Sequence, residues 1–224
     1  MSKHLERDLE HLQREILALS ARVEEMIAKA CFALRAKRAD VAQEVIEADA
    51  VIDQREVRIE EECLKILALH QPVAVDLRRT ATVLKVNNDL ERIADLAVNI
   101  AERAQCLAAH PQFDLPETLE RMADVATSMV RDALDSLVHL DAAAARSVCV
   151  RDEEVDAYNR EVIDELYLVM QHRPELIEAA LHLFSASRHI ERIADHATNI
   201  AEDVIYLVEG EIARHKHGET YLPR

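Results

Sequence analysis

The chain has 224 residues and half of them are hydrophobic, so it is long enough to bury a sizeable core in one or two domains. Its 43 acidic and 27 basic residues give a formal net charge of -16, which argues against a nucleic-acid partner because polyanion binding depends on Lys and Arg. The only two glycines, Gly210 and Gly218, lie late in the chain. A P-loop and a glycine-rich dinucleotide turn are therefore excluded.

The cysteines and the apolar pattern favour a cytoplasmic protein. No CxxC pair occurs, so neither a disulfide framework nor a zinc knot is expected. The four cysteines are dispersed at helical positions: Cys31, Cys63, Cys106 and Cys149. No stretch approaches the ~18 uninterrupted apolar residues of a membrane span. We expect the protein to reach a membrane only through a partner.

The first half of the chain is predicted to form three long helices. A heptad seam that begins at Leu5 predicts the first, and Asp40 followed by Gln43 is typical of a capping box that opens the second. The segment His70-Gln71-Pro72 should end that helix, because proline disfavours helical geometry in the residue before it. The third helix is expected over about 76–108.

The same plan is repeated in the second half. Residues 110–116 contain two prolines and no helical period, which indicates a boundary. A second heptad seam then runs from Leu119 to Leu140, and Asp141 can cap the following helix. His172-Arg173-Pro174 breaks the chain again, and a last helix is expected over about 175–209.

The sequence therefore predicts an all-α fold of two tandem three-helix bundles. The first repeat is expected at 1–110 and the second at 116–210, where Gly210 is a suitable helix stop. Residues 211–224 lack periodicity and are expected to form a loose tail.

One motif occurs twice, one hundred residues apart, in the predicted last helix of each repeat. It reads ERIADLAVNIAE at 91–102 and ERIADHATNIAE at 191–202. Residues four apart share a helix face, so each copy places Glu, Asp and Asn in one row of oxygen-bearing side chains. On a helical wheel the row lies beside the apolar stripe, and the oxygens should therefore flank the core.

Each row should face a second acidic pair across a hairpin. In the first repeat, Asp53 with Glu91 and Asp49 with Asp95 are both symmetric about Pro72. In the second repeat, the corresponding pairs are symmetric about the break before Pro174. Each hairpin is thus expected to gather four carboxylates and an asparagine. The candidate metal ligands are Asp49, Asp53, Glu91, Asp95, Asn99, Asp152, Asp156, Glu191, Asp195 and Asn199.

Four unpaired carboxylates would raise each other's pKa, and a bound cation removes that cost. An all-oxygen set suits Mg²⁺, Ca²⁺, Mn²⁺ or iron better than structural zinc, although the ion could be iron, Mn, Mg or Zn in a divalent or trivalent state. His196 stands where the first copy has Leu96, so the two sites should differ. The alternative is that these acids are ordinary surface residues paired with nearby arginines.

At these motifs the chain resembles the PhoU family of phosphate-uptake regulators. The resemblance covers both three-helix repeats, the two ERIAD-x3-N rows and the ending from Val204 to His215, with Ala94 and Ala194 where family members often have Gly. It implies a non-enzymatic, cytoplasmic negative regulator of the phosphate-starvation response, with metal clusters on the candidate ligands. The implied partners are the ATPase of the phosphate ABC transporter and a sensor histidine kinase, and a homodimer stays open.

Two other interpretations stay open. A di-metal carboxylate enzyme of ferritin-like type would use Glu plus Glu-x-x-His rows, but no Glu-x-x-His occurs in this chain. A metal-free helical adaptor would need the acids only for solubility. Metal content separates the adaptor from the other two, and oxygen-dependent turnover would identify the enzyme.

Overall fold

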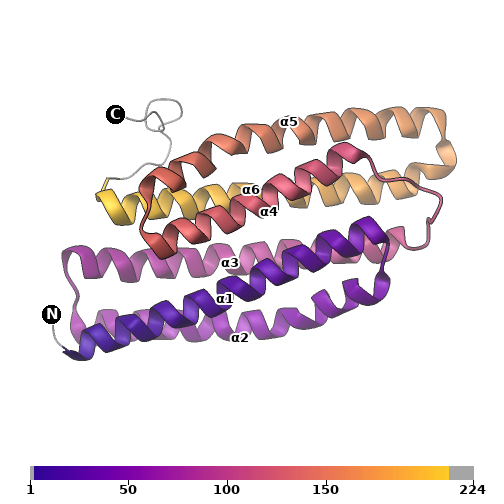
Figure 1. Ribbon diagram of the computed structural model, residues 1–224. Coiled ribbons are helices and arrows are strands. Elements are labelled where there is room, and N and C mark those ends of the chain that lie inside the picture. The colour runs from indigo at the N-terminus through magenta and orange to yellow at the C-terminus, as the bar shows by residue number, and fades with distance from the viewer. Residues whose placement is uncertain (1–2, 212–224) are drawn as a thin grey trace.

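The computed structural model describes residues 3–211, and within that range it contains six α-helices, one short 3-10 turn and no strand (Figure 1). The elements are α1 (Lys3–Ala36), α2 (Ala39–His70), α3 (Ala74–Leu107), α4 (Glu117–His139), α5 (Ala142–His172), η1 (Pro174–Leu176) and α6 (Ile177–Glu209). The predicted all-α class is confirmed.

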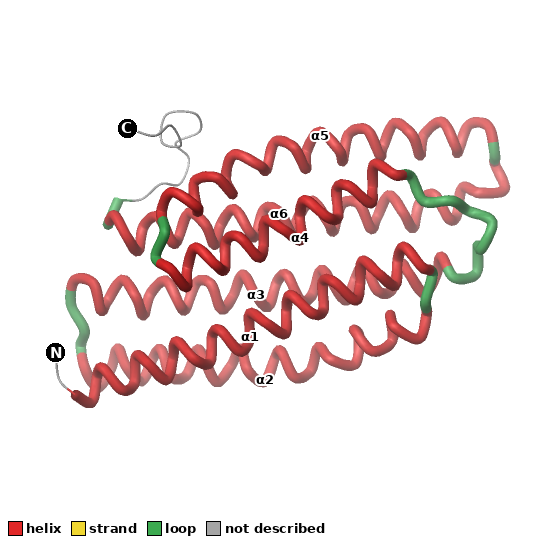
Figure 2. The backbone as a smooth tube through the Cα atoms, viewed as in Figure 1, coloured by secondary structure: helices red, strands yellow, loops and turns green. Residues whose placement is uncertain are grey.

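The helices form two three-helix bundles that lie side by side, as Figures 1 and 2 show. Helices α1 to α3 make the first bundle and α4 to α6 the second, with α3 packed against α6 along the middle of the molecule. Helices α2 and α5 lie on the outer sides, and α1 and α4 cross in front in this view. Two tandem three-helix repeats, as predicted, are the architecture.

The core follows the apolar stripes read from the sequence. On α1 the seam positions Ile16, Leu19 and Val23 are at most 1% exposed, and Ile93 and Ile100 on α3 are fully buried. Burial of side chains of this size contributes roughly 1.5–3 kcal/mol each, so these stripes supply most of the force that joins the helices. Helical spacing of three and four puts them on one face of each helix.

Most of the helix ends lie where the capping and stop residues of the sequence predict them. Gln71 and Gly210 adopt left-handed backbone conformations, with φ 45° and 77°, and end α2 and α6. The side chain of Asp141 accepts hydrogen bonds from the backbone N–H groups of Ala143 and Ala144, at 2.9 and 3.0 Å, and so caps α5. These residues fix where the hairpins turn.

The predicted capping box at Asp40 and Gln43 is wrong. Helix α2 already begins at Ala39, so Asp40 lies inside its first turn, where Arg38 donates two hydrogen bonds to it at 2.8 and 2.6 Å. Gln43 donates to Glu47 at 2.9 Å instead of reaching back to the helix start. A bidentate arginine two residues earlier in the chain occupies the oxygens that a cap would need.

The predicted second heptad seam extends one residue beyond the end of helix α4. Helix α4 ends at His139, and Leu140 turns into a left-handed conformation with φ 54°. Its side chain is 42% exposed, whereas Leu137, one turn earlier, is 9% exposed.

Residues 212–224 of the predicted tail lie outside the described residues. In the described part, no helix is long and apolar enough to cross a membrane.

Polar contacts join the two repeats across the α3–α6 interface. The ammonium of Lys85 pairs with the carboxylate of Asp203, which is 2% exposed. His196 Nδ1 lies 2.8 Å from Asp89 Oδ1, and both side chains are largely buried. These contacts hold the two hairpins in one orientation relative to each other.

Candidate functional site

The α2–α3 hairpin brings the predicted acids of the first repeat together. Burial raises the pKa of Asp49, and the negative charges of Asp53 and Asp95 raise it further. Burial also raises the pKa of Glu91, with Asp95 as the strongest negative neighbour and Asp53 as a weaker one. Asp95 on α3 thus lies within electrostatic range of Asp49 on α2, and Asp53 within that of Glu91, whereas direct pairing of these carboxylates across the hairpin stays a prediction.

The α5–α6 hairpin repeats this arrangement, with a larger pKa shift at one of its carboxyl groups. Burial, followed by the charges of Asp195 and Asp156, raises the pKa of Asp152 to about 6. Burial is also the main cause that raises the pKa values of Glu191 and Asp195, and Asp156 adds to both. The second cluster therefore contains a carboxyl group that is partly protonated near neutral pH.

Neighbouring arginines neutralise only part of each cluster. Arg92 lies 3.4 Å from both Glu91 and Asp95, and Arg188 lies 2.8 Å from Glu191. One buried oxygen of Asp49 has no hydrogen-bond partner in the described structure. Surface pairing with arginines thus explains part of the row on α3 or α6, but among residues 3–211 it provides no ion pair to Asp49, Asp53, Asp152 or Asp156.

The chemistry of these donors fits a hard cation, although the side chains have not converged on one point. Carboxylates with raised pKa values and an orphaned buried oxygen are the state expected of ligands without their ion. Within residues 3–211, no group of three or more Asp, Glu, His or Cys side chains is arranged to hold a metal. Coordination would require rotamer changes, and the ten-residue ligand set stays a prediction.

The two motif asparagines have different surroundings. Asn99 donates to the backbone oxygen of Asp95 at 2.8 Å, on its own helix and beside the first cluster. The amide nitrogen of Asn199 instead lies 3.5 Å from Asp89 across the repeat interface, next to His196. The predicted difference between the two motifs therefore concerns the contact between repeats, because His196 faces Asp89.

Sequence reasoning left Glu56 out of the ligand set. Burial and negative neighbours raise its pKa, and its charge in turn raises that of Glu91. The amide of Asn87 donates to the backbone oxygen of Glu56 at 2.9 Å and to its carboxylate at 3.1 Å. Glu56 continues the helical row of Asp49 and Asp53 by one turn, so the same spacing could have identified it.

The corresponding position in the second repeat is Asn159, by the shift that relates Asp49 to Asp152. Asn159 is 4% exposed, and its side-chain oxygen has no hydrogen-bond partner among the residues that the structure describes. The first cluster thus has one carboxylate more than the second. If both bind ions, the first should accept the higher cation charge.

Removing the buried charge of Asp152 should stabilise the metal-free protein at neutral pH. The folded-state pKa is about 6, above the ordinary value of 3.8, so ionisation at pH 7.5 disfavours the folded state. After allowance for solvent screening, Asp152→Asn should gain about 1–2 kcal/mol in unfolding free energy. The gain should vanish by about pH 3.5, below the ordinary pKa, where the wild-type carboxyl is protonated both folded and unfolded.

Denaturant unfolding in the presence of a chelator, at pH 7.5 and 3.5, measures this effect. Exposed Glu154, on the same helix, provides the control Glu154→Gln, which should leave the stability unchanged at both pH values. Equal stabilities of Asp152→Asn and wild type at pH 7.5 would show that the second cluster is well solvated.

These features define a class of protein: all-α, built from two three-helix repeats, with a cluster of carboxylates in the last hairpin of each. The family model described as the PhoU domain matches residues 16–104 and again residues 119–204. The chain therefore belongs to the PhoU family, as the motifs had indicated.

Relatives match the chain over nearly its whole length. The phosphate-specific transport system accessory protein PhoU homolog of Aquifex aeolicus is 40% identical over 94% of this chain and 96% of its own. The homolog in Deinococcus radiodurans is 38% identical over 94% of this chain and 99% of its own.

Solved structures agree with the fold. The crystal structure of PhoU from Pseudomonas aeruginosa matches with a TM-score of 0.89 and 39% identity, over 92% of this chain and 99% of that one. The phosphate transport system regulatory protein PhoU from Streptococcus pneumoniae matches with a TM-score of 0.86 and 31% identity, over 93% and 98%.

Proposed function

We propose that this protein is a cytoplasmic negative regulator of phosphate uptake and of the phosphate-starvation response. It would act by binding, and link the ATPase of a phosphate ABC transporter to a sensor histidine kinase. The observation that supports this role most is that relatives matching 94% of the chain are named phosphate-specific transport system accessory proteins. An accessory role also agrees with a non-enzymatic protein.

The carboxylate clusters would serve as metal sites in this regulator. Asp49, Asp53, Glu91 and Asp95 would hold an ion in the first hairpin, with Glu56 at its edge, and the corresponding acids would hold one in the second. The ion would supply the positive charge that offsets the repulsion between the carboxylates. The hairpin residues themselves would then hold α2 against α3, and α5 against α6, in a fixed geometry for partners to recognise.

The net charge of the protein predicts the charge of the surfaces that its partners present. With a formal charge of -16, the protein should attract basic protein surfaces, and this attraction chiefly accelerates encounter. Association with the ATPase or the kinase should slow as salt rises, since exposed charges are screened over a Debye length of about 8–10 Å.

Deleting the gene tests the regulatory role. The deletion strain should express phosphate-starvation genes in high phosphate, and a plasmid copy of the wild-type gene should restore repression. Normal repression in a deletion strain without a paralogue would refute the proposal. Interferometry at several salt concentrations can measure how the purified protein associates with the ATPase and, separately, with the kinase. These measurements test each proposed partner by itself.

A metal-free adaptor is the second candidate. It is favoured by one observation, the lack of a metal-ready group of three or more ligands in the described residues. Elemental analysis of protein purified without a tag distinguishes it from the metal-bearing regulator. The same samples, examined by sedimentation, report whether the protein is a homodimer.

A further inference from the structure

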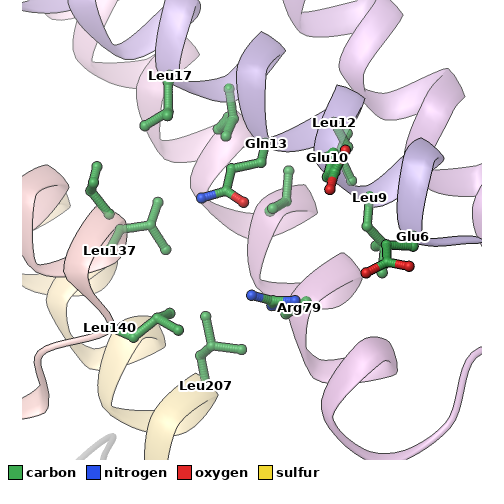
Figure 3. A pocket seen from close by; sticks show the side chains of 13 residues that line it. Glu6, Leu9, Glu10, Leu12, Gln13, Leu17, Arg79, Leu137, Leu140 and Leu207 are labelled. Carbon is green, nitrogen blue, oxygen red and sulfur yellow. The ribbon is translucent and has the colours of Figure 1, made fainter. Parts of the chain in front are cut away.

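A cleft opens between the two repeats, where α1 and α3 begin and α4 and α6 end. Its volume is about 310 Å³. Leu137, Leu140 and Leu207 line it from the second repeat (Figure 3), and Leu9 and Leu12 face them from the first. Apolar walls from both bundles and a volume of this size suit one large side chain with part of its backbone.

The polar groups of the cleft are few and distinctive. In Figure 3 the guanidinium of Arg79 points into the open space between Leu207 and Gln13, and Glu6 and Glu10 stand along the α1 side. Among residues 3–211, Arg79 makes no hydrogen bond or ion pair, although most arginines of this acidic chain have one. Its five N–H donors are therefore available to acceptors in the cleft.

The other end of the molecule shows what such a groove accommodates. Leu140 at the end of α4 corresponds to Lys37 at the end of α1, and both have left-handed backbone conformations, with φ 54° and 52°. Lys37 Nζ donates to the backbone oxygens of Pro111, at 2.8 Å, and of Phe113. Phe113 belongs to the linker between the repeats, which turns at residues 108–109 and 111–112, and its side chain is 2% exposed.

The linker also touches the opposite wall of that second groove. His110 lies 3.9 Å from Glu178, and Glu178 corresponds to Arg78, the neighbour of Arg79, by the shift of one hundred residues. The linker therefore contacts two positions, Lys37 and Glu178, that the repeat relates to Leu140 and Arg78 beside the open cleft. The linker and its buried Phe113 thus lie at the place that the repeat relates to the open cleft.

We propose that the open cleft is a docking site for an extended peptide segment of a protein partner. The segment inserts one aromatic side chain among Leu137, Leu140 and Leu207, as the linker does with Phe113 at the other end. Arg79 donates to the backbone oxygens of the segment, in the role of Lys37. The inference rests on the proposed function only in taking the partner from the phosphate-uptake system.

The charges of the cleft select this occupant over two others. Glu6 and Glu10 favour a segment that carries Lys or Arg next to its aromatic residue, and they disfavour a small anion bound by Arg79 alone. A second copy of the chain would bring another net charge of -16 to an acidic rim. A basic, aromatic peptide satisfies the leucines, Arg79 and the glutamates together.

The linker itself supplies a probe. A synthetic peptide with the sequence of residues 108–116 and the change Asp114→Lys should bind with a dissociation constant of about 1 mM. Methyl NMR of leucine-labelled full-length protein should then show shifts at Leu137, Leu140 and Leu207. The same peptide with Phe113→Ala should bind at least tenfold more weakly.

Two protein variants complete this test. Leu140→Asp places a charge in the cleft and should weaken peptide binding at least tenfold, and it should fold because the side chain is 42% exposed and Asp tolerates φ 54°. Leu168→Asp, at a residue 53% exposed on α5, is the matched control and should bind normally. Shifts that are absent, or equal for the Phe113→Ala peptide, overturn the proposal.

Other occupants would be revealed by the same signals. If deletion of residues 212–224 changes the methyl signals of the cleft in the absence of peptide, those residues occupy the cleft. If sedimentation finds a dimer that Leu140→Asp dissociates, a second copy fills it. Either result overturns the proposal of a partner peptide.

Binding to the proposed partners separates this inference from the proposed function. Wild type and Leu168→Asp should bind the ATPase or the kinase equally, and Leu140→Asp at least tenfold more weakly. If wild type binds neither protein, the proposed function fails, while the peptide test still judges the cleft. If Leu140→Asp binds both partners as wild type does, the cleft is not their docking site.

Discussion

Replacing both Asp95 and Asp195 with alanine is expected to abolish most metal binding and to leave a helical protein. Each residue acts on several members of its cluster: the charge of Asp95 raises the pKa of Asp49 and Glu91, and that of Asp195 raises the pKa of Asp152. Loss of either should therefore remove a central ligand. The side chains flank the core, as the 40% exposure of Asp95 shows, so their truncation opens no internal cavity.

Elemental analysis of protein purified without a tag under anaerobic conditions measures the loss. Asp124→Ala with Asp132→Ala is the control, because these acids are exposed and paired with Arg35 and Arg151 outside the clusters. Equal metal content in the Asp95 and Asp195 double variant and in wild type would reject the ligand assignment. Loss of helical circular dichroism would show instead that the fold depends on the metal.

Local signals explain why the hairpins and most of the acids could be predicted from the sequence. Pro72 and Pro174 stop helices through geometry that depends only on adjacent residues, and they thereby fix the centre of each hairpin. Once the centre is fixed, helical rise decides which residues meet across it. Asp49 is therefore expected to face Asp95, whose charge raises its pKa, and the same helical row also includes Glu56.

Contacts between the repeats could not be predicted in this way. Asp89 meets His196, and Lys85 meets Asp203, across two helices whose relative orientation depends on the whole core. No turn relates their positions in the sequence. Helical spacing alone predicts Asn199 in the acidic row, whereas in the structure its amide nitrogen faces the other repeat.

The exposed Leu140 illustrates a different limit. A seam predicts burial only while the helix continues, and α4 ends one residue earlier. The residue that breaks the pattern lines the open cleft between the repeats, where sequence periodicity gave no indication of a binding surface.

Replacing Lys85 with methionine is expected to destabilise the protein by about 3 kcal/mol. The apolar stem is retained, but Asp203, 2% exposed, loses the ammonium that pairs with its charge. The cost lies at the low end for a broken buried pair because the Lys85 side chain is 41% exposed. A weak cation–π contact with Tyr206, whose ring centroid is 5.9 Å away, is lost as well.

Denaturant unfolding of single and double variants isolates the contribution of this pair. Asp203→Asn in the Lys85→Met background should recover a large part of the loss, because the buried negative charge that pairs with Lys85 is then gone. Lys65→Met, which breaks an exposed pair with Glu62, should cost less than about 0.5 kcal/mol. A loss in Lys85→Met as small as that control would mean that the Lys85 ammonium contributes little to stability, and that apolar packing and the Asp89–His196 contact hold α3 against α6.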